Sequence, residues 1–376
     1  MDIAIILTYR CNSKCSMCNI WKNPSLPQEE ISLATLAKLP DNFGTINLTG
    51  GEPTLRKDLP EIVDLLYPKT KKFEISSNGL LPEKIEPLIK KYPDIKIRFS
   101  LEGSEETNNK IRGERNGFRT KVDGLARLKA LGGTDLGLAA VIQDDNVAEL
   151  VELFRFAEGH GYELSTSTLH NGFQFHKSDN VPYDRLLVAR YIENLIVEKL
   201  KTNNIKNWFR AYLDLGLIAR VLGNRRLLAC KSGYECAFID PWGDVFACNV
   251  RPDLHLGNLE TQSWQDIMSS RKALNVLEQV NQCQQNCWMV GTAKTAMRNP
   301  RFKQLPRLQP LAWVVQNKIR VMFGGQINFQ RYVDYPMEMG GNAVPVRPSY
   351  LDETVKKKVQ TKHEPHYSQP GGYVNH

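Results

Sequence analysis

Short apolar runs alternate with helical stretches through the first half of the chain, and this alternation constrains the fold more than any other feature. Stretches such as PEIVDLLYP, KVDGLARLKALG and AELVELFRFAEGHG have the apolar period of helices that pack on a core. The strand-like runs between them lie at 2–8, 44–49, 72–77, 95–101, 136–142 and 163–168. Six strand–helix repeats predict an α/β fold in which a parallel sheet curls into a partial barrel.

The first apolar run leads directly into TYRCNSKCSMCNIW, which places Cys11, Cys15 and Cys18 within eight residues. The amino-terminal residues lack the features of a signal peptide, and the sequence has no apolar run of about 18 residues. We therefore expect a cytoplasmic protein. In that reducing compartment, its eight cysteines are expected to bind metal or to take part in chemistry instead of forming disulfides.

Three thiolates at this spacing can converge on one object, which could be a zinc ion or an iron–sulfur cluster. A closed structural zinc site needs a fourth ligand, which a distant His or Cys would have to supply. Iron–sulfur clusters are also held by cysteine thiolates, usually four. A cluster held by three leaves one iron open, where a small molecule can coordinate. The missing fourth thiol therefore favours a functional cluster.

The CxxxCxxC spacing after a first strand resembles the radical S-adenosylmethionine (SAM) superfamily, and the resemblance covers roughly residues 1–290. It implies that Cys11, Cys15 and Cys18 hold a [4Fe–4S] cluster whose fourth iron binds the amino and carboxylate groups of SAM. The segment NLTGGEPTLR resembles the GGEP motif of that family, which contacts the SAM amino group. Its glycines allow close approach of the backbone to a ligand, and a Glu or main-chain carbonyls can accept hydrogen bonds from an ammonium group.

Later segments place polar residues at the carboxyl ends of strands, where ligands of such sheets bind. SNG resembles a TNG turn of the family, although a plain turn explains SNG better when it is taken alone. SLEG has Glu102 where the family often has Asp. Arg112 is a candidate for binding the SAM carboxylate, with a surface salt bridge as the alternative. The resemblance implies SAM contacts from Met17, Gly50, Gly51, Glu52, Pro53, Ser77, Asn78, Ser100, Arg112 and Gln143.

A second set of cysteines follows two expected helices, YDRLLVARYIENLIVEKLKT and KNWFRAYLDLGLIARVLG. Cys230 and Cys248 bracket a strand, a PWGD turn and a returning strand, the form of a β-hairpin. Cys283 and Cys287 follow an expected helix, SWQDIMSSRKALNVLEQV. This arrangement resembles the twitch domain, related to the SPASM domain, and implies that these four cysteines hold an auxiliary [4Fe–4S] cluster. Cys236 is then a small buried hydrophobe or a substrate-facing group.

The carboxyl-terminal region carries most of the net charge. Residues 301–376 contain 11 Lys or Arg and 5 Asp or Glu, a balance of +6 within a net charge of +8. PRLQPLAWVVQNKIRVMFGG has an apolar body with Arg307, Lys318 and Arg320 around it. It could form a basic amphipathic helix that makes peripheral membrane contact, or a helix docked over the cluster domain with snorkelling basic side chains. No interleaved aromatic and basic residues indicate a nucleic-acid module.

These features divide the chain into five expected regions. They are a radical SAM partial barrel of the (β/α)6 TIM type at 1–180, a helical connection at 181–228, a twitch or SPASM-like domain at 229–295, a basic extension at 296–339 and a flexible tail at 340–376.

The resemblance implies radical chemistry. Reductive cleavage of SAM, with an electron from a flavodoxin- or ferredoxin-type donor, gives methionine and a 5′-deoxyadenosyl radical that abstracts hydrogen, while the protein positions the substrate. The auxiliary cluster could take a second electron. We therefore expect an oxidoreductase of the dehydrogenase type that acts on a small polar molecule such as a sugar, an aminocyclitol or a phosphorylated metabolite.

Two other functions compete with this one. A radical SAM peptide maturase, which epimerises, crosslinks or dehydrogenates a peptide, ranks second because such enzymes often carry a leader-binding segment before the barrel, whereas here the first strand begins at about Asp2. A two-cluster electron carrier without catalysis is disfavoured by the intact GGEP segment. His160, His170 and His176 are candidate general bases, with a packed or solvated residue as the alternative for each.

Overall fold

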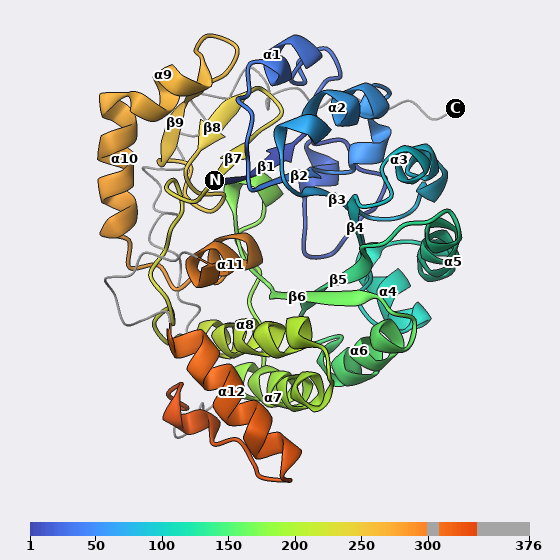
Figure 1. The fold of residues 1–376 in the computed structure, drawn as a ribbon, viewed down its shortest axis with the longest axis vertical. Coiled ribbons are helices and arrows are strands. Elements are labelled where there is room, and N and C mark those ends of the chain that lie inside the picture. The colour runs from blue at the N-terminus through green and yellow to red at the C-terminus, as the bar shows by residue number, and fades with distance from the viewer. Residues whose placement is uncertain (299–307, 337–376) are drawn as a thin grey trace.

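The computed structural model describes residues 1–298 and 308–336. Arg307 and the expected tail at 340–376 lie outside the described residues. One nine-stranded sheet with the order β6-β5-β4-β3-β2-β1-β7-β8-β9 forms the centre of the fold (Figure 1). The strands are β1 (Asp2–Ile6), β2 (Thr45–Thr49), β3 (Phe73–Ser77), β4 (Lys96–Ser100), β5 (Leu136–Ile142), β6 (Glu163–Thr168), β7 (Cys236–Ile239), β8 (Asp244–Phe246) and β9 (His255–Asn258).

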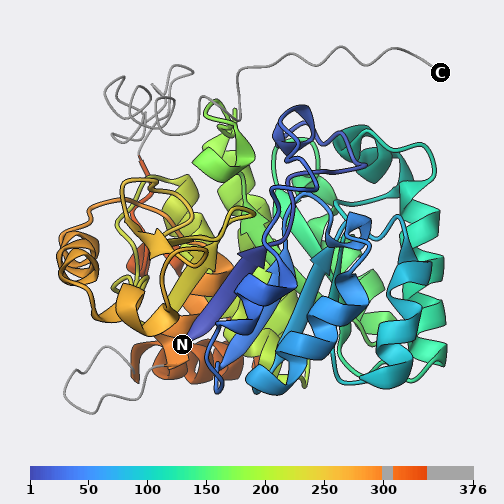
Figure 2. The ribbon, with the colours of Figure 1, turned by 90° about the horizontal axis from the view of Figure 1, so that it is seen from above.

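The six expected strands are confirmed, each within two residues of its expected ends. They pair in parallel and curve, with helices as an outer layer (Figures 1 and 2). The helices are α1 (Leu33–Ala37), α2 (Leu59–Leu66), α3 (Glu86–Lys91), α4 (Glu105–Arg112), α5 (Gly117–Ala130), α6 (Leu150–Gly159), α7 (Arg185–Lys201), α8 (Ile205–Val221), α9 (Trp264–Ser269), α10 (Arg271–Asn281), α11 (Val290–Arg298) and α12 (Leu308–Met322). The fold is therefore the expected partial α/β barrel.

One expected helix is wrong in extent. SWQDIMSSRKALNVLEQV forms two helices, α9 and α10, because the backbone at Ser270 is extended, with φ −67° and ψ 152°. The Ser270 hydroxyl accepts a hydrogen bond from the Ala273 amide at 3.0 Å, which caps the start of α10.

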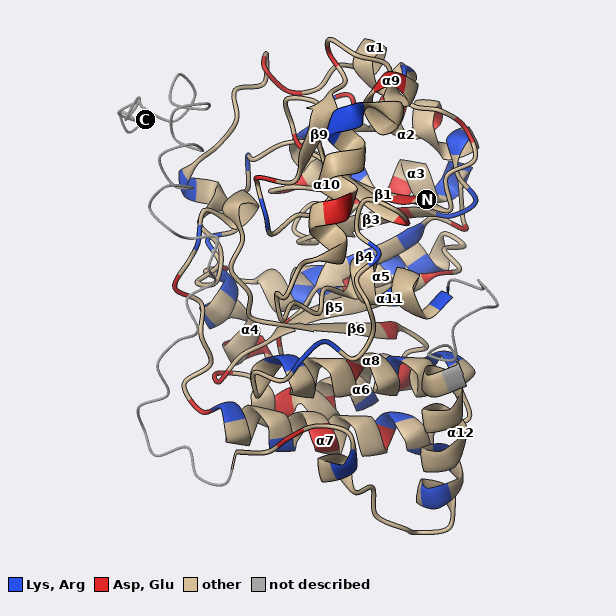
Figure 3. Ribbon diagram, turned by 90° about the vertical axis from the view of Figure 1, so that its left-hand side faces the viewer, with Lys and Arg blue, Asp and Glu red and all other residues tan. Residues whose placement is uncertain are grey.

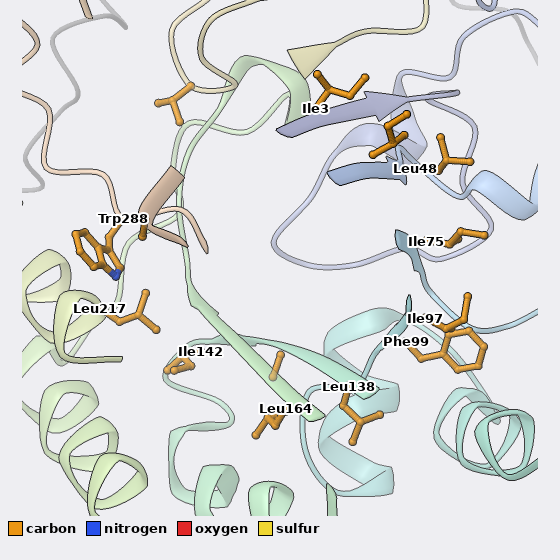
Figure 4. Packing of buried hydrophobic residues seen from close by; sticks show 14 of the residues in the cluster. Ile3, Leu48, Ile75, Ile97, Phe99, Leu138, Ile142, Leu164, Leu217 and Trp288 are labelled. Carbon is orange, nitrogen blue, oxygen red and sulfur yellow. The ribbon is translucent and has the colours of Figure 1, made fainter. Parts of the chain in front are cut away.

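Side chains alternate between the two faces of the curved sheet, so the core and the functional cavity lie on opposite sides. Apolar residues such as Ile3, Ile75 and Ile97 point outward to the helices (Figure 4). The inward positions are mostly polar, for example Asn47 and Ser76, and they line a cavity of about 1120 Å³. Closed barrels of this kind fill their interior with packed side chains. This partial barrel instead keeps an open lumen with many polar side chains in its lining.

The cavity extends along the whole length of the parallel strands. Its lining includes the first residues of strands, such as Asp2 and Lys96, and residues at their carboxyl ends, such as Gly50 and Ser100. The amino and carboxyl ends of the strands therefore border one continuous space.

The auxiliary hairpin is joined to the barrel through the sheet. β7 pairs in parallel with β1, and Asp2 lies opposite Cys236. The expected hairpin at the PWGD turn is confirmed as β7 and β8, but the third strand, β9, and the pairing with β1 were not predicted. α11 packs on β7 and on α8, which itself packs on β6. α11 therefore lies across the gap in the barrel between β6 and β7 (Figure 1).

Helix α12 packs on α7 and α8, not over the cluster domain as the docked alternative expected (Figure 3). Trp313 and Val314 are buried there. The Lys318 ammonium donates to Leu200 O and Thr202 O, both at 2.9 Å, so it faces the protein. Within the described part of the chain, no helix is both long and apolar enough to cross a membrane.

Candidate active site

The cysteine loop begins where β1 ends, and the turn at Gly50 and Gly51 supports it. The Gly51 amide donates to Thr8 O at 2.7 Å. A Cβ on Gly51 would lie 2.2 Å from Arg10 O, and a Cβ on Gly50, where φ is +148°, would lie 2.5 Å from Thr8 O. Glycine is required because the two chain segments touch here. We expected these glycines to allow a ligand to approach the backbone. Both instead allow close approach of the backbone that enters the cysteine loop. Gly50 also lines the cavity.

A buried carboxylate that the sequence analysis missed holds the base of this loop. Glu30 accepts hydrogen bonds from Ser25 Oγ at 2.7 Å, from Arg10 Nη2 at 2.8 Å and from Thr8 Oγ1. Burial opposes the charge of Glu30, but these bonds outweigh burial and lower its pKa. Glu30 lies in an irregular segment outside any motif, so only the tertiary structure reveals its role.

Glu52 of the GGEP segment is fully buried and joins that segment to the SNG turn. Its carboxylate accepts hydrogen bonds from the Thr54 amide at 3.0 Å, Ser77 Oγ at 2.9 Å and the Asn78 amide at 2.6 Å. Both carboxylate oxygens are therefore used within the protein. Of the two acceptors considered for an ammonium group, the main-chain carbonyls of this segment are the better candidates.

Two side chains from other segments reach the cysteine loop, one from the end of α4 and one from the turn after β3. Arg112 Nη1 lies 3.6 Å from Cys15 Sγ, and Asn78 Nδ2 lies 3.9 Å from Cys11 Sγ. The other guanidinium nitrogens of Arg112 donate to Glu102 Oε1 at 2.7 and 3.0 Å, and this ion pair is buried. A surface salt bridge, the alternative for Arg112, is therefore wrong.

The three thiols lie near enough to act on one another electrostatically. Burial raises the pKa of Cys11 to about 12 and that of Cys18 to about 11, although a backbone hydrogen bond opposes the rise at each thiol. Residues 1–298 and 308–336 contain no three His, Cys, Asp or Glu side chains gathered closely enough to hold one metal ion. Three thiols on one loop nevertheless form a donor set that suits an iron–sulfur cluster, because cysteine thiolates are the usual ligands of such clusters.

The remaining predicted cofactor contacts lie around the same edge of the sheet. Ser100 ends β4 and lines the cavity, and Pro53 is buried in the turn after Glu52. The main-chain carbonyl of Met17 accepts a hydrogen bond from Asn180 Nδ2 at 3.0 Å. Gln143 Nε2 is buried and lacks a hydrogen-bond partner among the described residues.

Several unpaired polar atoms also surround the mouth of the cavity. His170 Nε2, Gln174 Nε2 and Asn249 Oδ1 are buried without a hydrogen-bond partner among the described residues, and all three residues line the cavity. Buried polar groups are normally paired. These atoms, of which only His170 was singled out from the sequence, therefore fit a polar ligand.

The three histidine candidates occupy different surroundings. His160 ends α6 on the surface, and its Nδ1 contacts Phe156 O at 2.8 Å. Burial lowers the pKa of His176 to about 4, and its ring packs edge-on against Tyr9. Burial and the nearby Arg220 lower the pKa of His170 to about 4 as well. Of the three, His170 lines the cavity.

The second cysteine set gathers beside β8. Cys287 interacts electrostatically with both Cys230 and Cys283, and Cys248 interacts with Cys287 and Cys230. Arg226 Nη1 lies 3.8 Å from Cys287 Sγ and donates to Cys287 O at 2.6 Å. As at the first loop, a guanidinium group faces a buried thiol: burial raises the pKa of Cys287, and the charge of Arg226 opposes that rise.

Cys236 is buried, as the first of its two alternatives expected, and it also lies along the cavity. It is buried on β7, and its Sγ lies 3.8 Å from Ser232 Oγ. It also lines the cavity, next to Asp2 on β1.

Comparison with protein families finds two regions of similarity. Residues 5–157 match the model of the radical SAM superfamily, and residues 230–288 match the model of the SPASM iron–sulfur cluster-binding domain. The chain is 30% identical to a probable GTP 3′,8-cyclase of Saccharolobus islandicus over 59% of this chain and 73% of that protein. It is 29% identical to the mycofactocin maturase MftC of Mycolicibacterium smegmatis over 64% of this chain and 62% of that one.

Among solved structures, the protein anSMEcpe with bound AdoMet and the Cp18Cys peptide shares the fold. The TM-score is 0.57, the sequence identity 13%, and the match covers 86% of this chain and 98% of that chain. The chain spans 39% to 62% of the length of three of the curated relatives it matches.

Proposed function

The chain belongs to the radical SAM superfamily, and we propose that it is a peptide-modifying enzyme. SAM and [4Fe–4S] clusters are the cofactors of its two matched domains. The observation that carries the proposal is the size of the lumen, about 1120 Å³ along the whole barrel. Pockets for drug-sized ligands measure about 300–1,000 Å³. The same space would also admit SAM beside Gly50, Ser100 and Arg112. A single sugar or aminocyclitol, our first expectation, would contact only part of the remaining length, whereas an extended peptide could follow it.

The comparisons support the same substrate class. One relative is named a maturase, and one solved structure of the same fold was obtained with a peptide bound. Another relative is named a nucleotide cyclase, so the family similarity alone does not choose the substrate. The cavity is the feature of this chain that favours a peptide over a small molecule.

We assign the groups around the cysteine loop as follows. Cys11, Cys15 and Cys18 would hold the cluster that binds SAM, and when bound SAM supplies the radical that takes hydrogen from the substrate. Arg112 would offset the negative charge of the Cys15 thiolate, and Glu102 would hold Arg112 in place. Main-chain carbonyls of the GGEP segment would accept from the SAM amino group.

The substrate would be held by the unpaired groups at the mouth of the lumen. Gln174 Nε2 can donate and Asn249 Oδ1 can accept, which matches the amide groups of a peptide. His170, held through Nδ1 at 3.0 Å from Thr168 O, would present Nε2 to the substrate. As a largely neutral imidazole it could accept a proton there.

The second cysteine set would hold the auxiliary cluster through Cys230, Cys248, Cys283 and Cys287. A flavodoxin- or ferredoxin-type protein would supply electrons. If the auxiliary cluster removes an electron from the substrate, the net reaction is an oxidation. An epimerase would instead leave the oxidation state of the substrate unchanged.

A direct test compares substrate classes in the reconstituted full-length protein. With SAM and dithionite, we expect a pooled decapeptide library to raise 5′-deoxyadenosine formation above the basal rate, and modified peptides to be found by mass spectrometry. A mixture of sugars, aminocyclitols and sugar phosphates should not raise it. The reverse result would restore the small-molecule oxidoreductase, and no deoxyadenosine at all would favour a carrier.

Peripheral membrane contact through α12 is a separate proposal. Leu311, Val315, Ile319, Met322 and Phe323 are exposed, and all but Phe323 follow one face at helical spacing. Because Lys318 is engaged with α7, this contact would depend more on apolar side chains than on the basic charge we first expected.

A further inference from the structure

We propose that the amino-terminal end of the barrel lumen is a built binding site for a carboxylate of the substrate, formed by Lys294, Lys96 and Arg98. This inference rests on the proposed function, because the carboxylate is taken to belong to a peptide. Lys96 and Arg98 point inward from β4, and Lys294 comes from α11, which lies across the gap in the barrel.

A layer of charged side chains crosses the lumen at this level. Lys96 pairs with Glu74 at 2.9 Å, and Arg98 pairs with Asp135 at 2.6 Å. Glu163 on β6 binds both Arg98 and Arg210. Charged groups this well enclosed are rare in a protein unless they are paired or serve a function.

The sheet is shaped to hold Arg98. Gly137 lies opposite Arg98 on the neighbouring strand β5. A Cβ at Gly137 would lie 3.1 Å from Arg98 Cζ and 2.3 Å from Glu163 O, so a larger residue would displace the guanidinium group. Although Arg98 is only 2% exposed, its Nε–H lacks a hydrogen-bond partner among the described residues. A buried guanidinium N–H without an acceptor is costly, and a ligand oxygen would satisfy it.

Lys294 is the second donor available to a ligand, because it is half-buried and faces the cavity. It lines the cavity, and the described residues provide no hydrogen-bond or ion-pair partner for its ammonium group. Burial, followed by the positive charge of Lys96, lowers the pKa of Lys294 to about 8. Lys294 and Arg98 both act electrostatically on Glu74, which places them around the same part of the lumen. An anion bound there would stabilise the charged form of Lys294.

The charges of the cavity lining favour an anion. Besides Arg112 near the cysteine loop, the lining contains seven cations and four carboxylates: Lys72, Lys96, Arg98, Lys206, Arg210, Lys294 and Arg298, and Asp2, Glu74, Asp135 and Glu163. Positive groups therefore outnumber negative ones. We take the anion to be a carboxylate because the proposed substrate is a peptide, and phosphate serves as the competing probe in the test.

The position of this layer defines how a substrate would lie. Lys96 begins β4 and Ser100 ends it, near the cysteine loop, so the two ends of the lumen are about 13 Å apart at about 3.3 Å per residue. An extended peptide covers this distance in about four residues. We infer that the modified residue lies about four positions from the residue that carries the carboxylate, which is either the peptide terminus or an acidic side chain.

The test uses amine labelling of the reconstituted full-length protein and needs no turnover, so it is independent of whether the peptide is modified. The probes are pentaalanine with a free carboxyl terminus, pentaalanine amide, the same amide with glutamate as its central residue, and inorganic phosphate. Acetylation of Lys294 by acetic anhydride is measured by mass spectrometry, with the exposed Lys110 as the internal reference. We expect a carboxylate peptide to slow labelling of Lys294 at least threefold and to leave Lys110 unchanged.

Protection by free pentaalanine identifies the peptide terminus as the source of the carboxylate, and protection by the glutamate-containing amide identifies an acidic side chain. Protection by phosphate alone, equal protection by pentaalanine amide, or no protection would overturn the proposal. Binding of the protective probe, measured by isothermal titration calorimetry, should be abolished in Lys294→Met and retained in Lys294→Arg, whereas Lys110→Met should bind as the wild type does. The wild-type labelling decides the question even if a variant fails to fold.

Discussion

Arg112 Nη1 lies 3.6 Å from Cys15 Sγ while the same guanidinium group is held by the buried carboxylate of Glu102. Arg112, at the end of α4, thereby links the cysteine loop after β1 to Glu102 in the segment after β4. The Glu102 carboxylate is also held from β5, because the Val141 amide donates to Glu102 Oε2 at 2.7 Å. Glu102, which stands where the family often has Asp, is thus an orienting group for Arg112.

Replacing Arg112 by Leu should destabilise the protein strongly and impair cluster assembly. Removing one partner of a buried ion pair leaves an uncompensated charge and costs about 3–5 kcal/mol. Urea unfolding of the cluster-free protein measures the stability, and iron content after reconstitution measures assembly. The control is Arg119→Leu, because Arg119 and its partner Glu105 are both exposed, with an expected cost of about 0–1 kcal/mol. Equal losses in the two variants would contradict the role of Arg112.

The reconstituted protein should carry about eight irons per chain, as two cysteine-ligated clusters of four irons imply. Changing Cys11, Cys15 and Cys18 together to Ala should halve the iron and abolish SAM cleavage. Cys236→Ala is the matched control and should keep both clusters. Full iron content in the triple variant would refute the first assignment, and iron loss in Cys236→Ala would show that the auxiliary ligands are wrong.

Gly137→Ala should destabilise the barrel by about 1–3 kcal/mol, because the added methyl group overpacks the space between Arg98 and Glu163 O. Gly159→Ala, near the end of α6, meets no atom within 4 Å and should be neutral or stabilising by up to about 1 kcal/mol. Denaturant unfolding compares the two. A neutral effect at Gly137 would mean that the charged layer tolerates displacement of Arg98.

His170 should make the cluster-free protein less stable in acid. The unfolded state, with a His pKa near 6.5, binds a proton before the folded state does, where the pKa is about 4 because of burial and Arg220. Protonation of His170 therefore does not affect the free energy of unfolding above about pH 6.5. As the pH drops from there toward 4, it lowers that free energy by on the order of 3 kcal/mol. Unfolding free energies measured between about pH 7 and pH 4.5 should show a smaller decline in His170→Gln. His160→Gln, on the surface, should decline as the wild type does.

If α12 contacts membranes, Ile319→Asp should weaken co-sedimentation with anionic liposomes about tenfold or more. The apolar contact of such a side chain is worth about 1.5–3 kcal/mol. Gln316→Asp adds the same charge at an exposed polar position of the same helix and should have a smaller effect. Equal effects would indicate a charge response alone, and no binding by the wild type would remove the membrane proposal.

The sequence by itself determined the barrel strands and the candidate ligands. Alternation of apolar and polar residues shows which face of a strand is buried, and helical periodicity shows where the covering helices lie, so the strands from β1 to β6 were predictable. The cysteines were predictable because their spacing is local. Ligands that lie on one loop can be recognised in the sequence without knowing which distant segments come into contact.

Only the tertiary structure decided which distant surfaces meet. Nothing in the residues around Asp2 specifies that β1 pairs with Cys236 of β7, because backbone hydrogen bonding is common to every strand. In the same way, Lys96, Arg98 and Lys294 look like ordinary surface charges in the sequence. They become one charged layer because the sheet curves around a lumen and α11 lies across its gap.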